Sequence, residues 1–214
     1  MKKIKLIPFV IITCFYLNTS NAQTTNDISG EWQFGLGLNV IKDNGKKGEV
    51  KSLNFGNPFI LSAEYAFSNQ FSLNAGLSFN KYKEGQAVDG LVVAEGDSAS
   101  YMAFDLSLKF YFRELWDTNN FEPYVLAGFG YTTIGSYEAL NEGKNIIRQF
   151  PRVGRMTMNV GLGTNYRFSE SWGMNLNVMA KFGAKSGENK DFISNQGQIS
   201  LGVFYSFLKK DWRS

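Results

Sequence analysis

Hydrophobic and polar residues alternate along most of the chain in segments of strand length. In residues 32–40 every even-numbered side chain, from Trp32 to Val40, is apolar, and the odd-numbered residues are Gln, Gly or Asn. Successive side chains of a strand point to opposite faces, so this segment has one wholly apolar face. The same alternation recurs in residues 59–67, 71–79, 101–112, 123–131, 156–168, 172–182 and 199–207. The sequence therefore predicts eight strands.

The polar face of these strands indicates which side of a barrel it lines. Most segments have about the 9 to 11 residues with which a tilted strand crosses a hydrocarbon layer. A soluble lipocalin-like barrel also alternates, but its apolar side chains point inward and its polar face meets water. Here the polar face is mostly Gly, Asn, Ser and Thr, with few charges. Small residues suit the inside of a narrow barrel, so a membrane barrel is favoured and a lipocalin-like binding barrel is the weaker alternative.

The connections between the predicted strands alternate in length. The second, fourth and sixth fall at residues 68–70, 113–120 and 169–171, whereas the other four span residues 42–57, 84–99, 133–155 and 183–196. Outer-membrane barrels combine short periplasmic turns with longer external loops, and they carry aromatic girdles near the strand ends. The fold class predicted is all-β, an eight-stranded antiparallel up-and-down transmembrane β-barrel over residues 31–208.

The N-terminus has the three parts of a secretory signal. Lys2, Lys3 and Lys5 precede an apolar run over residues 6–17, and a polar stretch leads to Ala22. We expect a signal peptide over residues 1–22, a short periplasmic segment over residues 23–30 and a periplasmic tail over residues 209–214. The apolar run is shorter than the roughly 20 residues that a membrane-spanning helix needs. Cys14, the only cysteine, lies within it, so the mature chain has no thiol chemistry.

The net charge of +3 belongs to this signal segment. Without its three lysines the 22 basic residues fall to 19, which equals the number of acidic residues. A neutral mature chain lacks the basic surplus typical of nucleic-acid binding, and no nucleic-acid partner is expected.

Two segments carry a resemblance to a known family. Residues 123–131, PYVLAGFGY, resemble the glycine-rich strand of small eight-stranded outer-membrane proteins such as OmpX and the OmpA membrane domain. The last strand resembles the signal read by the barrel-assembly machinery, through Ser200, Gly202, Tyr205 and Phe207. The resemblance covers nearly the whole mature chain and implies export to the bacterial outer membrane, with the assembly machinery and outer-membrane lipid as partners. We expect no appended peptidoglycan-binding domain.

Five charged residues lie on the polar face of their strands, and they are Glu64, Asp105, Lys109, Arg167 and Lys181. An unpaired buried charge is costly, so we expect a polar network of ion pairs in a narrow interior. Lys109 with either Glu64 or Asp105 is the most economical pairing. Arg167 and Lys181 belong to the same network or lie near a hydrated rim.

The absence of histidine argues against an enzyme. Outer-membrane lipases, acyltransferases and proteases of similar architecture use a histidine for proton transfer. Histidine and mature cysteine are also the commonest transition-metal ligands, so no metal and no cofactor is expected. An open pore is disfavoured because eight strands enclose a space that side chains just fill. We therefore favour a structural or surface-interaction role, with a narrow pore for small solutes or ions as the alternative.

The predicted loops offer the remaining candidates. Residues 84–99 carry four acids and no base, and residues 133–155 carry a basic surplus, so opposite charges are one way to hold the two loops together. The loop interaction candidates are Ile146, Ile147, Arg148, Phe150 and Arg152. Their apolar members either dock on an unknown extracellular ligand or pack on the neighbouring loop, and packing is favoured. The basic members are candidates for binding lipopolysaccharide phosphates.

Overall fold

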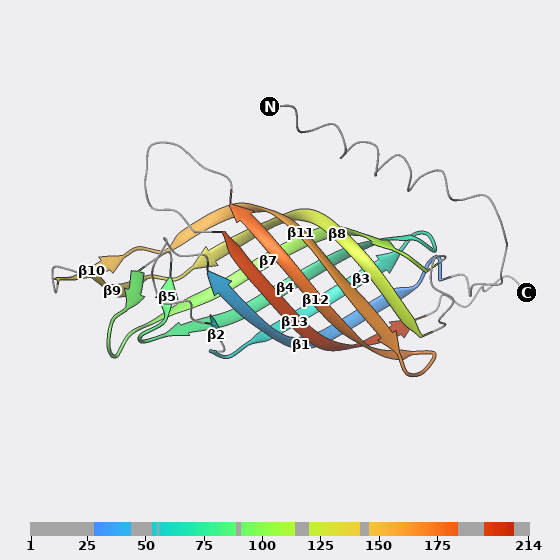
Figure 1. Cartoon of the computed structure of the whole chain (residues 1–214), viewed down its shortest axis with the longest axis horizontal. Helices are drawn as coiled ribbons and strands as arrows, with labels where there is room; N and C mark the ends of the chain where they lie inside the picture. Colours follow the sequence, from blue (N-terminus) through green and yellow to red (C-terminus); the bar gives the residue numbers. More distant parts are fainter. Residues whose placement is uncertain are drawn as a thin grey trace, which may run out of the picture.

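Eight antiparallel strands form a closed barrel (Figure 1). The computed structural model describes residues 28–43, 53–54, 56–88, 91–113, 120–141, 146–183 and 195–207. The barrel strands are β1 (Trp32–Asp43), β3 (Phe59–Ala66), β4 (Phe71–Lys83), β7 (Ser98–Tyr111), β8 (Phe121–Ile134), β11 (Val153–Arg167), β12 (Trp172–Gly183) and β13 (Gln196–Phe207). Each pairs with the next in this order, and β13 pairs with β1. The predicted eight-stranded up-and-down barrel is confirmed.

Two expected segments lie outside the described residues, namely the signal peptide over residues 1–22 and the tail over residues 209–214. No described residue belongs to a helix that is long and apolar enough to cross a membrane.

The apolar face of every barrel strand points outward. Leu106 in the middle of β7 is 44% exposed, whereas its neighbours Asp105 and Ser107 are buried. The seven side chains predicted to face lipid are all exposed, and they are Trp32, Leu36, Leu61, Leu73, Leu106, Leu176 and Val203. This arrangement is the reverse of a lipocalin-like barrel, in which the apolar side chains fill the interior.

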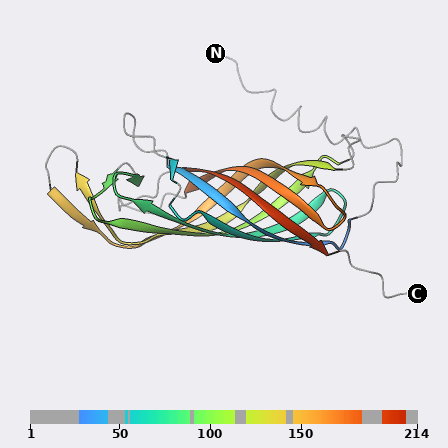
Figure 2. The same ribbon diagram turned by 90° about the horizontal axis from the view of Figure 1, so that it is seen from below.

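The predicted alternation of short and long connections is confirmed. The short ones lie at one end of the barrel, over residues 67–70, 112–120 and 168–171, and the described chain begins and ends there (Figure 2). We call this the turn end and the opposite one the loop end. Strands β7, β8 and β11 have 14, 14 and 15 residues, so they continue further at the loop end than the sequence predicts. The extra outward residues include Ser98 and Ser100, which are polar. The apolar alternation therefore ends before the strand does, and it did not predict the extension.

Two predicted loops contain short strands. A second sheet has the order β10 (Ile146–Phe150), β9 (Tyr137–Asn141), β6 (Leu91–Val93) and β5 (Ala87–Val88). The pairing of β6 with β9 joins the connection between β4 and β7 to the connection between β8 and β11. Backbone pairing therefore links the two loops, where the sequence suggested opposite charges. The β9–β10 hairpin projects farthest from the barrel in Figure 2.

The wall is irregular between β1 and β3. Gly37 of β1 pairs with Ile60 of β3, and Ile41 pairs with Asn54 of β2 (Leu53–Asn54). Four residues of β1 therefore span the same length as six residues of the opposing chain, which bulges outside the ladder. Pro58 has no N–H to donate, and Asn57 has a φ of 54°, so the chain departs from strand geometry here. The sequence did not predict this bulge or β2.

Candidate functional site: the barrel interior and the loop end

The interior is filled with polar and aromatic side chains from the inward faces of all eight strands. Because these positions alternate with the outward apolar ones, each interior residue is two positions from the next on its strand. The five charges expected in the interior lie in three separate groups along the lumen, and each charge contacts an opposite one.

Glu64 on β3 and Lys109 on β7 form the first group. Lys109 Nζ donates to Glu64 Oε2 over 2.6 Å. The Lys109 side chain is 4% exposed and the Glu64 side chain is 6% exposed. The other carboxylate oxygen accepts hydrogen bonds of 2.5 Å from the Ser72 and Tyr111 hydroxyls. Lys109 Nζ also lies 4.3 Å from the ring centroid of Tyr124, a cation–π contact. Both charges are thus fully satisfied inside the barrel.

The first group continues through two asparagines. Asn165 donates to the Tyr111 hydroxyl over 3.1 Å, and Asn175 donates to both the side-chain oxygen Oδ1 of Asn165 and the Tyr124 hydroxyl. A cavity of about 50 Å³ lies beside this network, lined by Glu64, Lys109 and backbone that the small interior residues leave uncovered. A water needs at least roughly 10 to 15 Å³ of such space, so the cavity has room for a few waters.

Asp105 on β7 and Lys181 on β12 form the second group, nearer the loop end. Lys181 Nζ lies 2.6 Å from Asp105 Oδ2 and 3.3 Å from the Tyr101 hydroxyl. Asn159 donates to the other oxygen of Asp105 over 2.8 Å. Lys181 is 1% exposed, so the structure places it deep in the interior and away from a hydrated rim.

Arg167 on β11 belongs to the third group, at the turn end. Its Nη2 lies 2.7 Å from Glu31 Oε1, and its Nε lies 3.1 Å from Glu122 Oε1. Arg113 Nε contacts the same oxygen of Glu122 over 3.1 Å. Two arginines and two glutamates therefore close this end. The sequence analysis missed Glu31, Arg113 and Glu122, although each lies two positions beyond an inward residue and so continues the inward phase of its strand.

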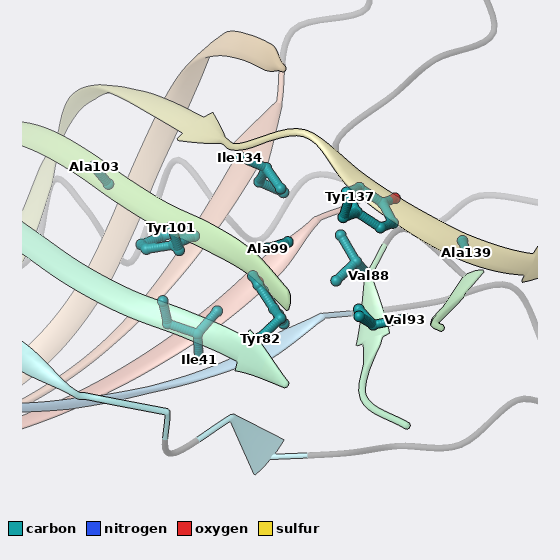
Figure 3. Packing of buried hydrophobic residues seen from close by; sticks show 10 residues of the cluster. All are labelled: Ile41, Tyr82, Val88, Val93, Ala99, Tyr101, Ala103, Ile134, Tyr137 and Ala139. Atoms are coloured by element: carbon teal, nitrogen blue, oxygen red, sulfur yellow. The ribbon is translucent and has the colours of Figure 1, made fainter. Parts of the chain in front are cut away.

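Two buried clusters pack beside these polar groups. Tyr111, Tyr124, Leu126 and Met179 form a buried cluster in the turn-end half of the lumen. At the loop end, a larger cluster combines barrel residues with residues of the second sheet (Figure 3). It consists of Ile41, Tyr82, Val88, Val93, Ala99, Tyr101, Ala103, Ile134, Tyr137 and Ala139, and we call it the loop-end plug.

The loop interaction candidates lie on or near β10. Phe150 is half-buried, packs against the loop-end plug and stacks on Tyr137 with 5.4 Å between ring centroids. Arg148 and Arg152 are exposed. Ile146 and Ile147 pair with β9 through their backbones, and their side chains lie outside the described residues. The structure thus places Phe150 against the molecule itself and leaves the two arginines facing solvent.

The residues of the expected assembly signal occupy both faces of β13. Ser200 and Gly202 point inward, and Gly202 lies directly opposite Gly37 of β1 across the closing seam. Tyr205 and Phe207 lie on the outward face, with ring centroids 4.5 Å apart, and Tyr205 also contacts Trp172. Their role in assembly stays a prediction.

The charged side chains of the described interior pair with one another. Every buried carboxylate of the two inner groups accepts hydrogen bonds from a lysine and from neutral donors. Within the described ranges, no group of three or more acidic residues is arranged to hold a metal ion. These pairs join side chains of different strands across the lumen.

Comparison with solved structures identifies the class of fold. Neisserial surface protein A is 15% identical, with a TM-score of 0.56 over 84% of this chain and 100% of that one. The outer-membrane protein OprG of Pseudomonas aeruginosa is 14% identical, with a TM-score of 0.55 over 85% and 97%. Ail of Yersinia pestis, bound to the heparin analogue sucrose octasulfate, is 14% identical, with a TM-score of 0.54 over 84% and 99%. Neither a protein-family model nor a curated protein matches the sequence. The chain therefore has the fold of the small eight-stranded outer-membrane β-barrels.

Proposed function

We propose that this protein is a non-enzymatic component of the bacterial outer membrane, whose barrel is closed to solutes and whose activity lies at the loop end. The outward apolar belt supports the membrane placement, because soluble proteins rarely expose a contiguous apolar surface of this extent to water. In this orientation the turn end faces the periplasm and the loop end faces outside, after export and signal cleavage.

The observation that carries the closed-barrel proposal is the filling of the lumen. Going from the turn end to the loop end, it holds the Arg113 and Arg167 ion pairs, the Glu64–Lys109 pair with the Tyr111 and Tyr124 rings beside it, the Asp105–Lys181 pair and the loop-end plug. Eight-stranded barrels have interiors that side chains just fill. A lumen filled in this way favours a structural or surface-interaction role through the loop end.

The membrane placement is tested by fractionation of cells expressing the full chain, combined with heat-modifiability on gels. A folded outer-membrane barrel remains in the outer-membrane fraction and migrates faster before boiling than after it. Recovery as a soluble periplasmic protein would reject the placement.

The closed lumen is tested by planar-bilayer recording of the purified barrel, with a large-pore porin as positive control. We expect no stable conductance steps. A narrow pore for small solutes or ions is the second candidate, and the polar cavity beside Glu64 and Lys109 is the observation that favours it. Large and stable steps would establish the pore and reject the closed barrel.

The surface role is tested at the exposed arginines of the β9–β10 region. The structure of Ail with a heparin analogue makes a sulfated polysaccharide a sensible first probe for a similar fold. Arg148 and Arg152 offer charge-assisted hydrogen bonds to such a polyanion. We expect the double variant Arg148→Gln/Arg152→Gln to elute from heparin at lower salt than the wild type. Unchanged elution would remove these arginines from the proposed surface.

A further inference from the structure

Three lysines gather at the loop-end edge of the outward apolar face. Lys42 on β1 and Lys81 and Lys83 on β4 are exposed and belong to the outward phase of their strands. Lys81 directly continues the outward row that ends in Phe79, and Lys42 continues the row that ends in Val40. Lys42 and Lys81 therefore occupy the first polar positions beyond the belt, and Lys83 occupies the next outward position on β4.

The neighbouring strand fixes the level of this boundary. Phe79 pairs with Met102 of β7, Lys81 pairs with Ser100, and Lys83 pairs with Ser98. The outward face of the β4–β7 pair thus changes from apolar to polar in a single step. In a bilayer the headgroups lie at such a boundary, and a lysine there keeps its aliphatic stem in the apolar layer and its ammonium at headgroup level.

The irregular stretch of wall lies between the two lysine-bearing strands. Beyond the end of the regular β1–β3 ladder at Ile60, Asn80 Nδ2 of β4 donates to the backbone carbonyl oxygen of Asn39 in β1 over 3.2 Å. Lys81 follows Asn80 in the chain, and Lys42 lies three residues beyond Asn39. The lysines consequently flank the same irregular stretch of wall.

We propose that Lys42, Lys81 and Lys83, the rim lysines, bind the phosphate groups of a glycolipid headgroup in the leaflet at the loop end. The inference rests on the proposed membrane placement. Three exposed lysines from two strands lie at the proposed headgroup height. Phosphate oxygens accept strong charge-assisted hydrogen bonds from lysine. Asp97 is an acidic group that interacts with Lys81, and its carboxylate also accepts the Glu138 N–H. Three lysines outnumber this one carboxylate.

A lipid fits this rim better than a soluble polyanion. A polyanion approaching from solution reaches first the projecting β9–β10 hairpin, which carries Arg148 (Figure 1). The rim lysines lie instead beside the apolar belt, where acyl chains pack on residues such as Phe79. The two basic groups are therefore separable by substitution.

The experiment uses the full chain, folded in phosphatidylcholine nanodiscs that contain a small fraction of diphosphorylated lipid A. Native mass spectrometry after gentle release counts the lipid A molecules that each barrel retains. We expect the variant Lys42→Gln/Lys81→Gln/Lys83→Gln to lose affinity by at least tenfold, since about 1 kcal/mol per basic residue near an anionic surface corresponds to about fivefold each. The comparison variant Arg148→Gln/Arg152→Gln removes the two arginines that the sequence offered for lipopolysaccharide phosphates, and the rim-lysine inference expects it to retain lipid A as the wild type does.

Two further arms identify the ligand chemistry. Dephosphorylated lipid A should bind weakly to the wild type, and millimolar inorganic phosphate should not displace the intact lipid. The variant Lys42→Arg/Lys81→Arg/Lys83→Arg should restore binding, and heat-modifiability confirms that each variant is folded. Equal retention of lipid A by the glutamine variant and the wild type would overturn the inference. Loss of binding in the comparison variant Arg148→Gln/Arg152→Gln alone would do the same.

The outcome is distinguishable from failure of the proposed function. A barrel that fractionates with the outer membrane but shows no lysine-dependent retention of lipid A contradicts the rim-lysine inference alone. A chain that remains soluble contradicts the membrane placement itself.

Discussion

Lys109 and Glu64 form an ion pair inside the barrel, with 2.6 Å between Nζ and Oε2 and almost no exposure of either side chain. Removing one partner leaves an uncompensated buried charge, which typically costs about 3 to 5 kcal/mol. We therefore expect Lys109→Met to lower the free energy of unfolding by that amount, measured by urea unfolding in lipid vesicles. Lys81→Met, at an exposed position, should change it little.

The double variant Lys109→Met/Glu64→Gln checks the physical cause. Glutamine still accepts the hydrogen bonds of Ser72 and Tyr111, and no buried charge remains. The double variant should recover a large part of the loss, because the penalty comes from the orphaned carboxylate. If the two single losses simply add in the double variant, the two residues do not act as a pair.

Gly37 and Gly202 face each other where the barrel closes, and both point inward. A Cβ on Gly37 would lie 2.6 Å from the Gly202 Cα and 2.4 Å from the Leu201 carbonyl oxygen. These are backbone atoms, so neither neighbour can move aside without separating the strands. We expect Gly37→Ala and Gly202→Ala each to slow or reduce folding into lipid vesicles in the absence of any cellular factor.

This prediction separates steric closure from recognition of the last strand. If Gly202 matters only because the assembly machinery reads it, Gly202→Ala folds normally in vesicles and Gly37→Ala is harmless everywhere. The seam geometry predicts similar defects for both variants in vesicles. Gly76→Ala serves as the control, because no atom lies within 4 Å of a Cβ built at that glycine.

Leu106 on β7 and Val178 on β12 mark the middle of the outward belt, and they are 44% and 45% exposed. An arginine at the bilayer midplane of a barrel costs roughly 2 to 4 kcal/mol. Leu106→Arg and Val178→Arg should therefore reduce the heat-modifiable fraction in the outer membrane. Leu106→Ala controls for the loss of side-chain volume and should assemble. Normal assembly of both arginine variants would contradict the membrane-facing assignment of these strand faces.

The alternation of apolar and polar residues predicted all eight barrel strands and the direction of their faces, because in a barrel each side chain has only two environments. The same alternation correctly predicted that five charged residues lie in the interior, namely Glu64, Asp105, Lys109, Arg167 and Lys181. Their partners could not be assigned, since pairing depends on the stagger of the strands around the barrel. Arg167 shows this clearly, because it pairs with Glu31 from the other end of the sequence.

The second sheet escaped prediction for a different physical reason. Strands β5, β6, β9 and β10 have 2 to 5 residues each, which is too short for a periodic pattern to stand out. Tyr137 and Val93 have no amphipathic strand around them that predicts burial. Their burial depends on contacts between two connections far apart in the chain, and the sequence alone does not specify these contacts.

Asp97 connects this second sheet to the barrel. Its carboxylate accepts the backbone N–H of Glu138 in β9, and Ala94 N donates to the Glu138 carbonyl oxygen over 2.8 Å. The hydrogen bonds from the Glu138 and Ser98 backbones lower the pKa of Asp97 below its ordinary value of 3.8. A lowered pKa in the folded state means that the stabilisation is present above the unfolded value and is lost as the pH falls through the folded value.

We therefore expect acid to loosen β9 before it loosens the barrel wall. Hydrogen–deuterium exchange of a peptide covering residues 137–141, corrected for intrinsic rates, should quicken as the pH falls from about 5 to about 2.5. A peptide from β12 should stay protected over the same range, because its backbone is paired on both sides by β11 and β13. Asp97→Ala should show the faster exchange already at neutral pH. If exchange at residues 137–141 is insensitive both to acid and to this substitution, Asp97 does not hold the second sheet in place.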